Sequence, residues 1–400
     1  MLAGGWRREF LAMYDVAIIG GGLHGGFTAW HLKQREPDLK VCIIEKDQTY
    51  EHAASARSNA GIRVLFSQEE SLRLSQYGHK IYGNFEELMG LEDQPAHLSF
   101  SQQGYLFIAN TAEQAADMTQ NYKIQSAMGA EADLIDATEL KNRFPSLNVS
   151  DITLACHSPK DGWINPGQAL SGLAKKNRAL GVVYIKAQVS GLTKSQNRIT
   201  EAVTETGEKI KSRWFVNAAG AWAPEITAML GFDIPVRPLP RITFYFECRD
   251  TLEPMGLTID GRGCSFKPEG GGYVTGHTVF ERAGAFDWTV HEDRFQSENW
   301  PLVAHRVPAF EAIQLKNAWA CHYALSTWDG NALIGAWPGQ PDNFLMTTGF
   351  SGHGLQHAPG AGRAISELIL DGCFTTLDLT RFAASRVAEG RKEPERGVKA

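Results

Sequence analysis

The sequence has no run of about 18 apolar residues, so it predicts no transmembrane helix. It has no excess of basic residues either, because 39 Lys and Arg stand against 45 Asp and Glu, for a formal net charge of −6. That balance gives no electrostatic reason to expect binding to nucleic acid or to an anionic membrane surface. Internal repeats and low-complexity segments are also absent. The remaining composition, 43% hydrophobic over 400 residues, is typical of a globular protein with room for two domains.

Cysteine is scarce, and the six residues are Cys42, Cys156, Cys248, Cys264, Cys321 and Cys373. They form no Cys-x-x-Cys pair and no spacing typical of metal ligands, so the sequence predicts no metal site. Scattered thiols of this kind are typical of a reducing compartment. We therefore expect a cytoplasmic protein without a disulfide framework.

The N-terminus lacks a complete export signal. Arg7-Arg8-Glu9-Phe10-Leu11 resembles a twin-arginine signal, which requires an apolar segment and a cleavage site to follow. A predicted strand begins at Tyr14 instead, and cleavage there would remove it. We interpret residues 1–13 as a short leader or arm.

The strongest positive signal is a glycine-rich turn between a strand and a helix in residues 14–34. The apolar strand leads to Gly20, Gly22 and Gly25, which have the G-x-G-x-x-G spacing. Gly20 permits the turn, Gly22 leaves room for a pyrophosphate, and Gly25 lets the helix pack close to the strand. The helix N-terminus then offers N–H groups and a positive dipole end to the phosphates.

A carboxylate follows at the spacing that a dinucleotide site requires. The second predicted strand, residues 40–44, leads to Glu45, about 20 residues past the last glycine, where an acid binds a ribose hydroxyl. A turn that serves only packing is the alternative. The combination of strand, helix and terminal acid favours the nucleotide site.

Other small-residue turns follow buried strands in the middle and at the end of the chain. This pattern favours a nucleotide domain of discontinuous segments, interrupted by a sheet-rich substrate domain. The predicted boundaries are 1–13 for the arm, 14–90, 150–232 and 319–385 for the nucleotide domain, 91–149 and 233–318 for the substrate domain, and 386–400 for a C-terminal tail. Helices are expected at 69–89, 291–315 and 359–370, and a hairpin at 264–278.

Five segments together resemble the D-amino acid oxidase superfamily of flavoproteins. They are the nucleotide-binding opening at residue 14, the loop 56–63, the turn 216–222, Phe266-Lys267-Pro268, and residues 348–354. The chain is similar to monomeric sarcosine oxidase, to D-arginine-type dehydrogenases and to the FAD-dependent oxidoreductase domain proteins of mitochondria. The resemblance implies an α/β (α+β) two-domain fold, with a Rossmann-like FAD/NAD(P)-binding domain and a large, mostly antiparallel sheet. It also implies FAD as the cofactor and oxidation of a C–N bond by hydride transfer to flavin N5.

The same resemblance assigns cofactor-binding residues. Gly20, Gly22, Leu23, His24 and Gly25 would surround the pyrophosphate, Glu45 the adenosine ribose, Arg57 and Ser58 the flavin and diphosphate, Val189 the adenine, and Ala219 and Gly220 the adenosine. The second set is Gly349, Ser351, Gly352, His353, Gly354 and Leu355 at the pyrimidine end of the flavin. Backbone N–H groups there would stabilise the negative charge that develops on reduction. His353 either adds to this effect or only fills a turn.

Cys321 resembles the cysteine that bonds covalently to the flavin 8α-methyl group in sarcosine oxidase-type enzymes. The shared pattern is Cys-x-Tyr before the glycine-rich turn, but the spacing to Gly349 and the flanking residues differ. A free cysteine that packs as a small hydrophobe is the alternative.

A substrate carboxylate favours arginine as its partner, and Arg63, Arg241 and Arg262 are the candidates. Arg241 and Arg63 resemble arginines near the substrate or flavin of relatives, and Tyr323 resembles an active-site tyrosine. The oxygen-activating lysine of the sarcosine oxidases would fall near Val274. The electron acceptor is therefore open between O2 and a quinone or other carrier.

The sequence thus predicts an FAD-dependent amine or amino-acid oxidoreductase with a small-molecule substrate. Catalytic candidates are Arg63, Arg241, Tyr323 and His353. A 2-hydroxy acid dehydrogenase remains an alternative, with His79, His277, His322 or His353 as the general base that a hydroxyl requires. A flavin-bearing assembly or scaffold protein is the third possibility. The substrate side chain and the oligomeric state stay open.

Overall fold

A computed structural model describes residues 13–397 of the chain, so the predicted arm at 1–13, apart from its last residue, lies outside the described residues. The first of its two large sheets has a core of parallel strands in the order β12-β1-β2-β9. Their bounds are β12 (Lys209–Asn217), β1 (Tyr14–Ile19), β2 (Val41–Glu45) and β9 (Val183–Lys186). β19 (Phe344–Thr348) extends the parallel set beside β12. Continuous apolar runs such as those of β1 and β2 are typical of strands buried on both faces.

Antiparallel strands complete this sheet. They are β10 (Val189–Ser195) and β11 (Arg198–Thr204) beyond β12, and β18 (Leu333–Gly335) beside β19. The helices α1 (Leu23–Arg35) and α9 (Gly354–Leu370) contact the strands of this sheet, α6 (Pro166–Ala179) packs on α1, and α2 (Glu69–Gly83) packs on α9. The strand, turn and helix predicted at residues 14–34 are therefore present.

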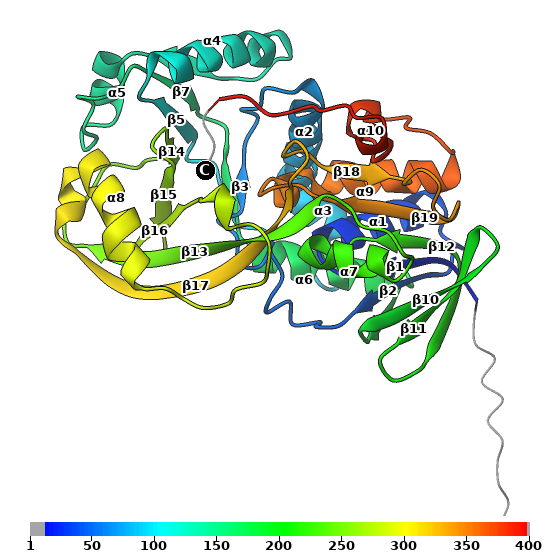
Figure 1. Ribbon diagram of the computed structural model, residues 1–400. Coiled ribbons are helices and arrows are strands. Elements are labelled where there is room, and N and C mark those ends of the chain that lie inside the picture. The colour runs from blue at the N-terminus through cyan, green and yellow to red at the C-terminus, as the bar shows by residue number, and fades with distance from the viewer. Residues whose placement is uncertain (1–12, 398–400) are drawn as a thin grey trace, which may run out of the picture.

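The second sheet has the order β17-β13-β16-β15-β14-β5-β7-β6, and only β14 and β5 pair in parallel. Its strands are β17 (Ile313–Ser326), β13 (Val236–Cys248), β16 (Gly272–His277), β15 (Cys264–Glu269), β14 (Leu257–Asp260), β5 (Tyr105–Ala109), β7 (Leu154–Ser158) and β6 (Asp133–Ile135). Figure 1 shows this sheet on the left, with the long β13 and β17 reaching toward the first sheet. The two-domain α/β fold with a large, mostly antiparallel sheet is confirmed.

Two strands pair across the predicted domain boundaries. β7 pairs with β5 and β6, although residues 150–232 were predicted to belong to the nucleotide domain. β17 pairs with β13 along its length up to Ser326, past the predicted boundary at residue 319. The division into domains otherwise stays a prediction.

Three predicted helices have different limits. Residues 69–89 form two helices, α2 and α3 (Phe85–Met89), which are separated at Asn84. The helix predicted at 291–315 is limited to short turns around α8 (Trp300–Arg306), and β17 begins at Ile313, because pairing with β13 satisfies its backbone. The last helix begins at Gly354 and contains Pro359. Proline has no N–H for the carbonyl of Leu355, and the hydroxyl of Tyr82 donates to that oxygen instead, at 2.7 Å.

Candidate functional site

A cavity of about 770 Å³ lies where β1, β12 and β19 end and where the two sheets meet. Its walls come from the glycine turn, the loop 44–61, the turn 218–222, the long strands β13 and β17, and residues 347–356. Ligands bind at the carboxyl ends of parallel strands, because backbone groups and helix N-termini converge there. The predicted cofactor segments are therefore collected around one space, although they are far apart in the sequence.

The glycine turn has the geometry that its spacing predicts. Gly20 has φ 103°, and a Cβ on Gly25 would lie 2.0 Å from the carbonyl oxygen of Gly20. Both positions therefore require glycine, one for conformation and one for close packing. A Cβ on Gly22 would meet no protein atom within 4 Å, because this residue lines the cavity.

Glu45 lies at the end of β2 and lines the same cavity. Its two carboxylate oxygens accept hydrogen bonds from Gly21 N at 2.6 Å and from Asp47 N at 2.8 Å. Burial raises the pKa of this carboxyl, and the two N–H donors oppose that effect. The acid is thus fixed beside the glycine turn, as a ribose-binding residue must be.

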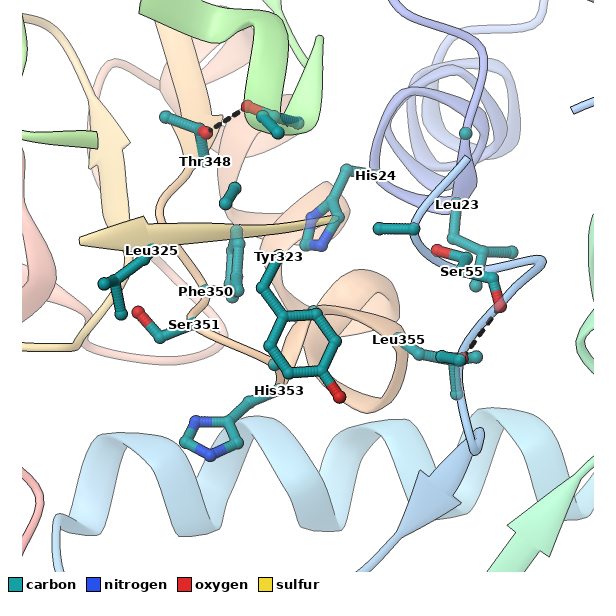
Figure 2. Close-up of a pocket in the computed structure, with 18 of the residues that line it drawn as sticks. Leu23, His24, Ser55, Tyr323, Leu325, Thr348, Phe350, Ser351, His353 and Leu355 are labelled. Atoms are coloured by element: carbon teal, nitrogen blue, oxygen red, sulfur yellow. Dashed lines mark hydrogen bonds between the residues drawn. The ribbon is translucent and has the colours of Figure 1, made fainter. Parts of the chain in front are cut away.

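The turn before α9 places backbone at the cavity wall. Gly349, Ser351 and Gly352 have φ of 74°, 51° and 98°. The Ser351 side chain holds this shape, since its Oγ accepts from Ser326 N at 3.0 Å and donates to the carbonyl of Gly349 at 3.2 Å. Figure 2 shows this turn, with Phe350 and Ser351, beside Tyr323 and His24. The N-terminus of α9 follows at Gly354, so its N–H groups lie at the cavity.

His24 is a neutral group at this wall. Burial lowers the pKa of His24 to about 4, so the imidazole carries no charge at neutral pH. Its Nδ1 lies 3.3 Å from Thr347 Oγ1, and its Nε2 is buried without a hydrogen-bond partner among residues 13–397. His353, also on the wall, packs edge-on against Phe66 with ring centroids 5.0 Å apart.

Arg241 and Tyr323 face the cavity from adjacent strands, β13 and β17. Arg241 is only 4% exposed, and its guanidinium carbon lies 5.0 Å from the centroid of the Tyr323 ring. The Nη1 atom of Arg241 is buried and has no hydrogen-bond partner in the part of the chain that the structure describes. A buried guanidinium nitrogen without an acceptor is costly, so this arrangement is suited to an anionic ligand.

Comparison with known proteins agrees with this geometry. The family profile described as FAD dependent oxidoreductase, DAO, matches residues 15–368. The chain belongs to the DAO family of FAD-dependent oxidoreductases. It is 33% identical to FAD-dependent oxidoreductase domain-containing protein 1 from Xenopus laevis, over 93% of this chain and 82% of that one.

Two further relatives in this family have named activities. The crystal structure of L-proline dehydrogenase from P. horikoshii superimposes with a TM-score of 0.86, at 27% identity, over 95% of this chain and 99% of that chain. Human mitochondrial sarcosine dehydrogenase is 24% identical over 93% of this chain, which spans 41% of that longer protein.

FAD is implied by the DAO family, and the residues present fit it. The cavity volume lies within the range of about 300–1,000 Å³ that small-molecule and cofactor sites occupy. Gly22 leaves space beside the glycine turn, and Glu45, the residue predicted to bind the ribose, lines the same cavity. Of the other assigned positions, Leu23, Ser58, Val189, Ala219, Gly220 and Leu355 line the cavity as well. The hydroxyl of Thr348 fixes one of these by donating to the carbonyl of Gly220 at 2.9 Å.

Arg57 and Cys321 are not among the residues that line the cavity. Arg57 is bonded through Nη1 to the carbonyl of Ala320 at 3.1 Å, so it joins the loop 56–63 to β17. Cys321 lies opposite Arg241 in the strand register but is only 2% exposed. Burial raises the pKa of the Cys321 thiol to about 11, which disfavours the reactive thiolate. The structure therefore gives no support to a covalent flavin link.

The other arginine candidates differ from Arg241. Arg63 lines the cavity, packs over the Phe66 ring at 3.8 Å and donates to the carbonyl of Leu65. Burial lowers its pKa, whereas Tyr105 and Glu395 act in the opposite direction. Arg262 lies outside the cavity lining and pairs with Asp260 at 3.0 Å. Of these three arginines, only Arg241 lines the cavity and has a buried guanidinium nitrogen without a hydrogen-bond partner among the described residues.

Of the four candidate general bases, only His353 lines the cavity. His79 lies 3.6 Å from Asp161, and His277 lies 3.7 Å from Glu298. His322 accepts from Asp287 N at 2.8 Å, and burial lowers its pKa to about 4. Val274 is buried at the expected lysine position, and Lys267, its partner in the β15–β16 register, binds Glu269.

Proposed function

We propose that this chain oxidises the C–N bond of an amino acid or a secondary amine, with non-covalently bound FAD. The observation that carries the proposal is the Nη1 atom of Arg241, buried on the cavity wall without an acceptor among the described residues. A carboxylate on the substrate would supply that acceptor, and a bond between two charged groups is stronger than one between neutral groups.

The chain's own contribution is to bind and orient the substrate. Arg241 holds the carboxylate, and the Tyr323 ring beside it limits where the amine nitrogen and its neighbouring carbon can lie. The apolar side chains of Leu257, Ile259 and Phe107 line the same space and exclude water. FAD, when bound, supplies the two-electron acceptor for the hydride. Orientation of this kind contributes several kcal/mol to catalysis without acid–base chemistry.

The relatives support an amine substrate, since the L-proline dehydrogenase and sarcosine dehydrogenase names describe oxidation of secondary amino acids. The 2-hydroxy acid alternative is less favoured, because three of its four candidate bases lie away from the cavity. The electron acceptor remains O2 or a quinone or other carrier.

The test is an anaerobic absorbance spectrum of the flavin-loaded protein with a panel of amino acids, sarcosine, dimethylglycine and 2-hydroxy acids. Bleaching by an amine supports the proposal. Bleaching by 2-hydroxy acids alone would instead indicate a 2-hydroxy acid dehydrogenase. A flavin that no compound bleaches would favour a scaffold role. In Arg241→Met, flavin reduction should no longer saturate with increasing concentration of the active amine. The matched control is Arg237→Met on the same strand, because Arg237 pairs with Asp233 outside the cavity.

A further inference from the structure

The C-terminal segment 391–397, here named the C-terminal strap, closes one side of the cavity. It follows α10 (Ser385–Ala388) and crosses from the first sheet toward α4 (Ala112–Ala127), as the red segment in Figure 1 shows. Hydrogen bonds hold it along its course. Glu393 N donates to Asp329 at 3.1 Å, Gln68 Nε2 donates to the carbonyl of Pro394 at 2.7 Å, and Asn121 Nδ2 donates to the carbonyl of Arg396 at 3.1 Å.

Glu395 of the strap lines the cavity. One carboxylate oxygen, Oε2, accepts from Ser67 N at 2.9 Å and from Ser67 Oγ at 2.5 Å. Ser67 Oγ in turn accepts from Arg396 N at 2.8 Å, so the strap and Ser67 fix each other. The second oxygen, Oε1, is buried and has no hydrogen-bond partner among residues 13–397.

No neighbouring group among the described residues donates a hydrogen bond to Glu395 Oε1. Arg63 lies close enough to interact electrostatically with Glu395, but the two form no ion pair within 4.0 Å, and Arg63 donates to Leu65 instead. A buried carboxylate oxygen without a donor carries a desolvation cost of about 1–3 kcal/mol or more. A donor on a ligand in the cavity would remove that cost.

We propose that Glu395 contacts the substrate and accepts a hydrogen bond from its amine nitrogen. The inference rests on the proposed function and extends it. Among the residues described, the charged side-chain atoms of the cavity wall that are both buried and without a hydrogen-bond partner are Arg241 Nη1 and Glu395 Oε1. A ligand with both a carboxylate and an N–H group would offer a partner to each of these atoms. The same negative charge disfavours substrates with a second carboxylate.

The experiment compares amines with analogues in which oxygen replaces nitrogen. The probes are L-proline with tetrahydrofuran-2-carboxylate, and sarcosine with methoxyacetate. For the amine, the measurement is the concentration that gives half-maximal flavin reduction in anaerobic stopped flow. For the oxygen analogue, it is the Kd from the shift in flavin absorbance.

Glu395→Gln keeps an oxygen for Ser67 but replaces the acceptor Oε1 with a donor. We expect the amine concentration that gives half-maximal flavin reduction to rise about tenfold or more, as for the loss of a charged hydrogen bond. The Kd of the oxygen analogue should change less than about twofold or fall. Equal shifts for the amine and its analogue, or no shift, would overturn the inference.

Glu393→Gln is the matched control, because this strap residue pairs with Arg381 at 2.5 Å and does not line the cavity. It should loosen the strap, measured by hydrogen exchange at residues 391–397, without changing the ratio of amine to analogue affinity. If neither amine bleaches the wild-type flavin, the amine assignment for these probes fails and the Glu395 inference falls with it. Bleaching of the wild type with an unchanged ratio in Glu395→Gln overturns the inference alone.

Discussion

A Cβ on Gly362 would lie 2.7 Å from the backbone carbonyl carbon of Phe27, so α9 and α1 touch backbone against backbone. Both helices begin at the cavity, with the glycine turn before α1 and the turn 349–353 before α9. The contact therefore sets the spacing between the two helix N-termini that we expect to face the cofactor. Packing between these helices thus affects the geometry of the site.

The first prediction tests that contact. Gly362→Ala should destabilise the fold by about 1–3 kcal/mol, the usual cost of overpacking, and should lower the FAD content of the purified protein. Chemical unfolding and the ratio of flavin to protein absorbance measure the two effects. Gly83→Ala is the control, since a Cβ there meets nothing within 4 Å and its stability should change little. A stable Gly362→Ala protein with full FAD would contradict the account.

A second prediction separates the two roles of the glycine turn. Gly22→Ala should leave the stability of the apoprotein unchanged, because its Cβ meets no protein atom within 4 Å and its φ of −63° suits alanine. FAD affinity should nevertheless fall about tenfold or more, because the methyl group occupies space in the cavity. Gly25→Ala, whose Cβ would lie 2.0 Å from Gly20 O, should lose both stability and FAD. Equal behaviour of the two variants in thermal unfolding would contradict this division.

The local signals in the sequence identified segments that the structure collects around one cavity. The glycine spacing at 20–25, the carboxylate of Glu45 and the turn 349–354 each depend on backbone conformation a few residues long. Such features can be recognised from a short stretch of sequence. Their collection around one cavity followed from the order of the segments, which the resemblance supplied.

Features that depend on tertiary packing were missed. Glu395 is a charged residue in a segment that the sequence indicated only as a tail, and its role depends on Ser67, 328 positions away. The face on which Arg57 and Cys321 lie could not be inferred from their motifs. Similarly, β17 replaces part of the predicted helix 291–315 because β13 is its partner, and that pairing spans most of the substrate domain.

The third prediction concerns Cys321. Acid precipitation of the flavin-loaded protein should release the flavin to the supernatant, because the thiol is buried and a pKa of about 11 leaves little thiolate at neutral pH. Absorbance of the supernatant and the intact mass of the protein measure the outcome. Cys321→Ala should retain its flavin, as should the exposed control Cys373→Ala. Flavin that stays with the wild-type pellet and is lost in Cys321→Ala would show that the link forms.

The fourth prediction concerns stability against pH. Burial lowers the pKa of His24 to about 4 and the pKa values of His31 and His357 to about 3, whereas an unfolded histidine titrates near 6.5. Between these values the unfolded chain binds more protons than the folded chain. The stability from burying neutral rings is therefore complete above about pH 6.5 and is lost as the pH falls.

The expected loss approaches about 1.4 kcal/mol per pH unit for each of these histidines once the pH is well below about 6.5, and it is smaller nearer to pH 7. Denaturant unfolding at several pH values between about 7 and 5 measures it. His31 Nε2 lies 3.0 Å from the carbonyl of Pro359, a contact that the amide of His31→Gln can replace as a donor. That variant should reduce the slope of unfolding free energy against pH by the contribution of one histidine. An unchanged slope in His31→Gln would mean that its protonation does not differ between the folded and unfolded states.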